Sequence, residues 1–227
     1  MVLARVLKEY DERKNEFLDA AQQLFYTRGY EQTSVNAILE KVGVAKGTFY
    51  HYFKSKEALL DSLIERMTGQ IIALIEKVVE DAELNAITKL NQVFETSANW
   101  KAAHKDLILT LLQSIYNDNN ILLRRKMFRR ATSRASPLVA KVIRQGLAEG
   151  VFDTPYPDEV SEMIFMQSNN LGDKIAELML GLEDRPDNRE AIFRILEVYE
   201  DAVERFLGAP QGSIHLADRA TLEELLR

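Results

Sequence analysis

The stretch that decides the fold covers residues 33–53 and reads TSVNAILEKVGVAKGTFYHYF. It predicts two very short helices joined at Val42-Gly43-Val44, because glycine readily adopts the positive φ of a tight turn. Thr33 can cap the first helix. Isolated helices shorter than about 12 residues are marginal in water, so packing against the preceding helix has to hold the pair. The pattern is typical of a helix-turn-helix.

The same stretch is basic within an acidic chain. Residues 41–56 hold four lysines and His51 without a single Asp or Glu, although the whole chain has a formal net charge of -6. Residues 1–56 carry nine basic and seven acidic side chains, whereas the remaining 171 residues carry twenty and twenty-eight. The acidic total argues against a nucleic-acid partner, but this division removes that argument for the N-terminal part. Lys46, Gly47 and Thr48 offer a cation, a backbone N–H and a hydroxyl, which phosphates and base edges accept.

Hydrophobic spacing is helical along nearly the whole chain. Phe17, Ala20, Ala21 and Leu24 follow the i, i+3, i+4, i+7 pattern of one helix face, and no segment alternates as a strand does. Ser136-Pro137 can split or kink one of the longer helices. We therefore expect an all-α chain of about nine helices, over residues 8–28, 34–41, 45–52, 56–80, 86–102, 105–116, 121–149, 158–180 and 188–207.

Composition and motifs exclude several classes of protein. The 227 residues include no cysteine, which excludes disulfide-stapled folds, thiol catalysis and cysteine-ligated metals. The three histidines, His51, His104 and His215, are too far apart in sequence for a metal-binding spacing. There is no common enzyme signature, signal peptide or membrane-spanning run. We expect no catalytic residues, no metal and no cofactor, and a location in the reducing cytoplasm.

Residues 11–71 closely resemble the N-terminal DNA-binding domain of the TetR family of transcriptional regulators. The most specific matches are LF at 24–25, GY at 29–30, TSV at 33–35, GVAKGTFYHYF at 43–53 and SKEAL at 55–59. Two residues depart from the usual pattern. Ala45 stands where a serine commonly caps the recognition helix, and Leu39 stands where a small alanine is usual.

The resemblance implies a three-helix head at residues 1–55, a helical ligand-binding and dimerisation body at 56–207, and a flexible tail at 208–227. Residues 45–52 would be the recognition helix, and Phe25, Phe49 and Phe53 would belong to the core. The resemblance places Lys46, Gly47, Thr48 and His51 at the major groove, and Thr33, Ser34, Tyr50, Lys54 and Lys56 at phosphates.

The body offers weaker signals. Aromatic and amide side chains at Trp100, Gln113, Tyr116, Phe165 and Asn169 are candidates for a ligand pocket, although aromatic residues at helical spacing are more often plain core. The amides near residue 169 could equally pack against the same helix of a second copy. A basic cluster at residues 124–134 could bind an anion, but a solvated helix face explains it as well.

Together these features predict a cytoplasmic, homodimeric, ligand-responsive regulator of transcription. Its partners would be a double-stranded DNA operator and a small-molecule inducer of unknown identity, with no membrane. We expect a repressor, and an activator is the alternative within the same class. The alternative from a different class is an all-helical binding protein or enzyme whose head is only structural.

Overall fold

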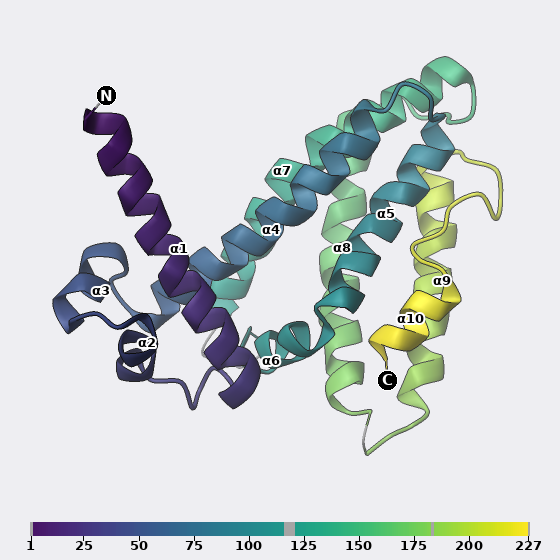
Figure 1. Cartoon of the computed structure of the whole chain (residues 1–227). Helices are drawn as coiled ribbons and strands as arrows, with labels where there is room; N and C mark the ends of the chain where they lie inside the picture. The colour runs from purple at the N-terminus through teal and green to yellow at the C-terminus, as the bar shows by residue number, and fades with distance from the viewer. Residues whose placement is uncertain (1, 116–120, 183, 227) are drawn as a thin grey trace. The chain divides into compact units, whose positions relative to one another are not determined.

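The computed structural model describes residues 2–115, 121–182 and 184–226, and throughout this part of the chain it contains helices and no strands (Figure 1). The predicted all-α class is confirmed, with ten helices in the described residues in place of about nine. The helices are α1 (Val2–Arg28), α2 (Val35–Val42), α3 (Lys46–Tyr52), α4 (Lys56–Glu80), α5 (Ala86–Ala103), α6 (Lys105–Ile115), α7 (Ile121–Glu149), α8 (Pro157–Leu180), α9 (Asn188–Leu207) and α10 (Arg219–Leu225).

Several helix boundaries differ from the predicted ones. Helix α1 begins at Val2 rather than near residue 8, and α10 adds a helix that the hydrophobic pattern did not resolve. Helix α7 is a single helix with Pro137 inside it. The Ser136 hydroxyl starts no new helix there. It is buried and donates to Ser161 Oγ on α8 at 3.1 Å, while Ser161 Oγ donates to the Ser136 carbonyl at 2.7 Å.

The chain forms two compact units. The first unit consists of residues 1–68 and 106–127, and the second of residues 69–105 and 128–227. Helices α4 and α7 each contribute residues to both units. The first unit contains the whole predicted head, together with α6 and the first half of α4.

Aromatic packing holds α3 to α1 in the first unit. Phe17, Phe25 and Phe49 are fully buried, and Phe53 is nearly so. The Phe17 ring centroid lies 5.7 Å from that of Phe49 and 5.9 Å from that of Phe53, with ring planes near perpendicular. This edge-to-face geometry suits the quadrupoles of aromatic rings. The predicted core positions of Phe25, Phe49 and Phe53 are confirmed.

The ends of α2 set the geometry of the turn. Ser34 caps the helix by accepting the Ala37 N–H at 3.1 Å, so the cap lies one residue beyond the Thr33 position predicted from sequence. Gly43 has a φ of 75°, as expected for the turn, and its N–H donates to the Leu39 carbonyl at 2.8 Å. A residue with a Cβ would be strained at this φ.

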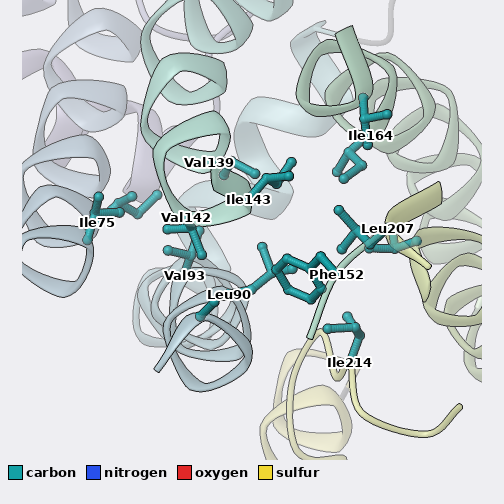
Figure 2. Packing of buried hydrophobic residues seen from close by; sticks show 14 of the residues in the cluster. Ile75, Leu90, Val93, Val139, Val142, Ile143, Phe152, Ile164, Leu207 and Ile214 are labelled. Carbon is teal, nitrogen blue, oxygen red and sulfur yellow. The ribbon is translucent and has the colours of Figure 1, made fainter. Parts of the chain in front are cut away.

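The second unit has its own apolar core, which Figure 2 shows from close by. Tyr199 of α9 donates its hydroxyl to the Ile164 carbonyl of α8 at 2.7 Å, and these two helices pack side by side. Phe152 lies so close to α7 that a Cβ at Gly146 would come within 2.0 Å of its ring. The core draws on α4, α5, α7, α8 and α9 and on the loops after α7 and α9, through residues that include Ile75, Leu90, Val93, Val139, Val142, Ile143, Phe152, Ile164, Leu207 and Ile214.

The C-terminal segment 208–226 is packed, where the sequence predicted a flexible tail. Ile214 is 1% exposed, and its N–H donates to the buried Glu204 carboxylate at 3.0 Å. Asn91 of α5 bonds the same segment twice, donating to the Ser213 carbonyl at 2.9 Å and accepting the His215 N–H at 3.0 Å. The glycines and polar residues that look like a linker in the sequence therefore lead into a segment with specific partners.

Replacing Ile214 by Ala should lower the free energy of unfolding of the second unit by about 2–5 kcal/mol, because the smaller side chain leaves a cavity in a packed core. Trp100 is the single tryptophan of the chain and lies in this unit, so its fluorescence in a urea titration follows the change. The exposed neighbour His215 provides the matched control as His215→Ala. An unchanged urea midpoint for Ile214→Ala would show that the segment is not packed.

Candidate nucleic-acid interface

Helix α3 has one buried side and one exposed side. Phe49 is fully buried, whereas Lys46, Gly47 and His51 are exposed. Tyr50 is 50% exposed, and its ring meets the edge of Phe49 at a centroid distance of 5.4 Å. Three of the α3 residues that the resemblance places at DNA, Lys46, Tyr50 and His51, thus have exposed side chains, while Phe49 on the buried side packs the helix against the first unit.

The first turn of α3 leaves its backbone accessible. Ala45 occupies the N-cap position and makes no side-chain capping bond, as expected from the missing serine. A Cβ built at Gly47 would meet no atom within 4 Å. Packing within the chain therefore gives no reason for a glycine at this position. A glycine here does allow another molecule to approach the backbone closely.

Ser34 and Lys54 lie on the surface in the loops before α2 and after α3. The Ser34 oxygen accepts the Ala37 N–H, and the same hydroxyl can donate to a further acceptor such as a phosphate oxygen. Lys54 carries an exposed ammonium group. Thr48 is half-buried between these exposed positions and the core.

Thr33 has a structural role instead of the predicted contact with phosphate. Its side chain is fully buried, and its hydroxyl lies 2.7 Å from the Gly29 carbonyl and 3.3 Å from the Leu24 carbonyl. It ties the loop before α2 to the end of α1. The expectation of a Thr33–phosphate contact is therefore wrong, since the donor is used inside the first unit.

Lys56 is also turned inward. Its ammonium donates to the Tyr30 carbonyl at 3.0 Å and lies 4.1 Å from the centroid of the Tyr30 ring. Burial raises the pKa of the Tyr30 phenol, and a hydrogen bond from the Ser55 side chain lowers the pKa of the Glu57 carboxyl beside it. Lys56 thus ties the start of α4 to the loop that follows α1, and the proposed interface does not include the phosphate contact that the resemblance implied for it.

Tyr10 is a residue to which the sequence analysis gave no role. Its ring centroid lies 4.6 Å from that of Tyr52 and 6.0 Å from that of His51, both on α3. A signal was present in the sequence, because Tyr10 precedes Phe17 by seven residues and therefore shares its face of α1. The sequence predicts a helix from residue 8, but only the three-dimensional structure shows that Tyr10 contacts α3.

The structure describes the side chains of three of the five ligand candidates, which lie on α5 and α8. Trp100 is half-buried on α5 and stacks on His104, with centroids 4.1 Å apart and planes inclined by 17°. Phe165 and Asn169 lie one turn apart on α8, where Phe165 packs against the core and Asn169 Nδ2 donates to Thr132 Oγ1 at 3.4 Å. Tyr116 and the side chain of Gln113 lie outside the described residues.

Three further features concern the basic cluster, metal ions and the membrane. In the basic cluster, Arg125, Lys126 and Arg129 are exposed, as a solvated helix face requires. Over the described residues, no group of three or more His, Asp or Glu side chains could hold a metal ion. None of the described helices has both the length and the apolar character needed to cross a bilayer.

Comparison with known proteins matches both parts of the chain. Residues 17–63 match the family described as bacterial regulatory proteins, tetR family, and residues 110–177 match the tetracyclin repressor-like C-terminal domain. The chain is 31% identical over 122 residues to a fatty acid metabolism regulator protein of Bacillus subtilis, across 53% of this chain and 61% of that protein. It is 27% identical over 152 residues to the transcriptional repressor KstR2 of Mycobacterium tuberculosis, across 65% of this chain and 73% of that protein.

A solved structure shows the same fold. The regulator FadR from Bacillus subtilis, in complex with stearoyl-CoA, superposes with a TM-score of 0.59 at 22% identity, over 81% of this chain and 96% of that one. A helix-turn-helix with an exposed basic helix and a second helical unit defines a class of DNA-binding regulators rather than enzymes. The chain belongs to the TetR family of bacterial regulatory proteins.

Replacing Gly47 by Ala should weaken DNA binding without harming the fold. The added methyl meets no atom of the chain and raises helix propensity. The free energy of unfolding should therefore stay constant or rise by up to about 1 kcal/mol, and the melting temperature should not fall. The methyl would obstruct a DNA backbone or base edge that approaches the α3 backbone. Gly69→Ala on α4 is the control, because its Cβ meets its nearest atom at an ordinary 3.7 Å. Equal DNA affinities for both variants would contradict a close approach at Gly47.

Proposed function

We propose that the protein is a transcriptional repressor that binds a pseudo-palindromic DNA operator as a homodimer and leaves it when a small molecule binds the second unit. The observation that carries the proposal is the exposed face of α3, where Lys46, Gly47 and His51 lie on the same short helix as Thr48, in a stretch, residues 41–56, that holds no Asp or Glu. A surface of this kind suits the major groove, whose base edges offer hydrogen-bond acceptors and donors.

Phosphate contacts complete the interface. Three exposed residues, Ser34 before α2, Tyr50 on α3 and Lys54 after α3, offer one cation and two hydroxyls. Such contacts fix the position of a protein on the duplex, whereas contacts to base edges select the sequence. The acidic surplus in the rest of the chain disfavours any other face as a DNA-binding surface.

The homodimer is proposed from the outer faces of α8 and α9. Met163 and Met166 on α8 are 44% and 61% exposed, and Val198 on α9 is 64% exposed. Exposed large apolar side chains on two helices that pack side by side are typical of an interface with a second copy. A dimer presents two α3 helices, which fit successive major grooves when their spacing is about 34–36 Å.

Regulation would follow from the spacing of the two α3 helices. A ligand that binds better to the second unit when these helices are farther apart lowers operator affinity by its difference in binding energy between the two states. A ligand indifferent to the spacing would change nothing. An activator would use the same DNA interface, but its ligand would bind better when the spacing of the α3 helices fits the operator. Repression is therefore the more specific part of this proposal. The protein would act in the cytoplasm, where its operator is accessible.

For the effector, we propose a fatty acyl thioester. The support comes from the relative described as a fatty acid metabolism regulator and from the similar fold of FadR, which was solved with stearoyl-CoA. The second unit offers half-buried apolar side chains around its core, including Phe94, Phe165 and Leu171. An acyl chain would pack against these apolar side chains. The amide of Asn169, a polar group, lies one turn from Phe165.

Selection from random duplexes should return a pseudo-palindromic sequence, with half-sites one helical turn apart if the protein binds as a dimer. Lys54→Ala should then weaken binding to all duplexes and reduce the slope of log affinity against log salt by about one, because one phosphate contact is lost. Thr48→Ala should also change which bases are tolerated. Lys77→Ala removes another exposed lysine, from α4, and should leave the slope unchanged.

Failure of the selection to enrich any sequence would contradict the proposed DNA-binding function. Enrichment of a single, unpaired half-site would contradict the dimer alone. An unchanged salt slope for Lys54→Ala would remove Lys54 from the interface and leave the function intact.

Stearoyl-CoA should raise the melting temperature of the protein and release the selected duplex, whereas coenzyme A alone should do neither. Ligand at 100 times its dissociation constant stabilises a native state by about 2.7 kcal/mol, which a thermal-shift measurement resolves. Octanoyl-CoA tests whether chain length matters. Release of the duplex by coenzyme A alone, or no shift with any thioester, would contradict the acyl part of the proposal.

A further inference from the structure

Tyr10 extends the aromatic packing of α1 beyond the part of the chain that matches the family. The match begins at Phe17, and Tyr10 lies two turns earlier on the same face of α1. There it contacts not the buried side of α3 but its last turn, through Tyr52 and His51. Tyr10 therefore stands at the border between the core of the first unit and the surface proposed to meet DNA.

The three rings form a closed group. Tyr10 and Tyr52 are 4.6 Å apart with planes inclined by 34°, and His51 meets Tyr52 at 5.1 Å with planes at 89°. Tyr10 meets His51 at 6.0 Å and 76°. Tyr52 is itself fixed by Phe17, at 5.6 Å, so the group is tied to the buried core.

This packing restricts an exposed side chain. His51 lies at the surface, where an imidazole normally samples several rotamers. Tyr10 and Tyr52 touch its ring from two elements of the fold, and each edge-to-face contact favours one ring orientation. A side chain that already holds its bound orientation loses less conformational entropy when it meets its ligand.

We propose that Tyr10 is a positioning residue of the DNA interface, which holds the His51 imidazole in the orientation that meets the duplex. This inference rests on the proposed DNA-binding function and adds a residue outside the family match to it. The contacts on which this role rests are those of the Tyr10 ring.

The test measures affinity of the full-length protein for its selected duplex in a double-mutant cycle. Tyr10→Leu should weaken binding about three- to tenfold, as expected from the loss of one or two aromatic contacts. Tyr10→Phe keeps the ring and should bind like the original protein. His51→Ala should weaken binding, and adding Tyr10→Leu to His51→Ala should cost nothing further.

The competing explanations give different results. An equal loss from Tyr10→Leu with and without His51 would show that Tyr10 acts through stability of the first unit, and the proposal would fail. A loss from Tyr10→Phe as large as that from Tyr10→Leu would point to a hydroxyl–phosphate contact instead. An unaffected Tyr10→Leu variant, alongside a weakened Lys54→Ala variant, would overturn the role of Tyr10 and leave the DNA-binding function standing. No binding by the unaltered protein would instead overturn the proposed function.

A spectroscopic measurement on the free protein keeps the proposal testable if a variant is unstable. The chain has three histidines, so the His51 ring protons can be assigned by their loss in His51→Ala. Ring currents of Tyr10 should shift these resonances, and the shift should persist in Tyr10→Phe and disappear in Tyr10→Leu. Identical His51 resonances in all three proteins would show that Tyr10 does not fix the imidazole.

Discussion

The proposed DNA interface depends on the burial of Phe49 against Phe17. Helices α2 and α3 have only eight and seven residues, too few to be stable alone in water. Their position comes from the fully buried Phe49 ring on one side of α3 and from Ile38 on α2. Because α3 is this short, fixing one side of it leaves the other side exposed in a defined orientation. The same packing that stabilises the first unit thus creates a rigid surface for another molecule.

The two sides of α3 have different roles. The aromatic side supplies the stability, and the exposed side carries Lys46 and His51 with a glycine whose missing Cβ serves no internal contact. The rest of the chain carries the acidic surplus, which keeps the overall charge negative while residues 41–56 remain free of acids. A net charge taken over the whole chain would have hidden this surface.

Much of this arrangement could be predicted from the sequence, because the short helices, Gly43 and the aromatic residues follow local rules of turn geometry and periodicity. The errors arose where two chemically similar residues compete or where distant segments meet. Thr33 and Ser34 can both cap a helix, and only the buried carbonyls near Thr33 decide which one does. The segment 208–226 has the composition of a linker. Its partner Asn91 is far away in the sequence, and no sequence pattern marks Glu204 as a partner. For the effector site, the sequence indicates suitable types of side chain but does not show which of them lie close together in space.

In the proposed complex, the exposed face of α3 enters the major groove, once for each of two copies. Protection of guanine N7 from methylation on the selected duplex tests it most directly, since that atom is accessible only in the major groove. We predict two protected patches whose centres lie one helical turn, about 10 base pairs, apart. Full binding without any protected guanine N7 in either half-site would contradict the claim.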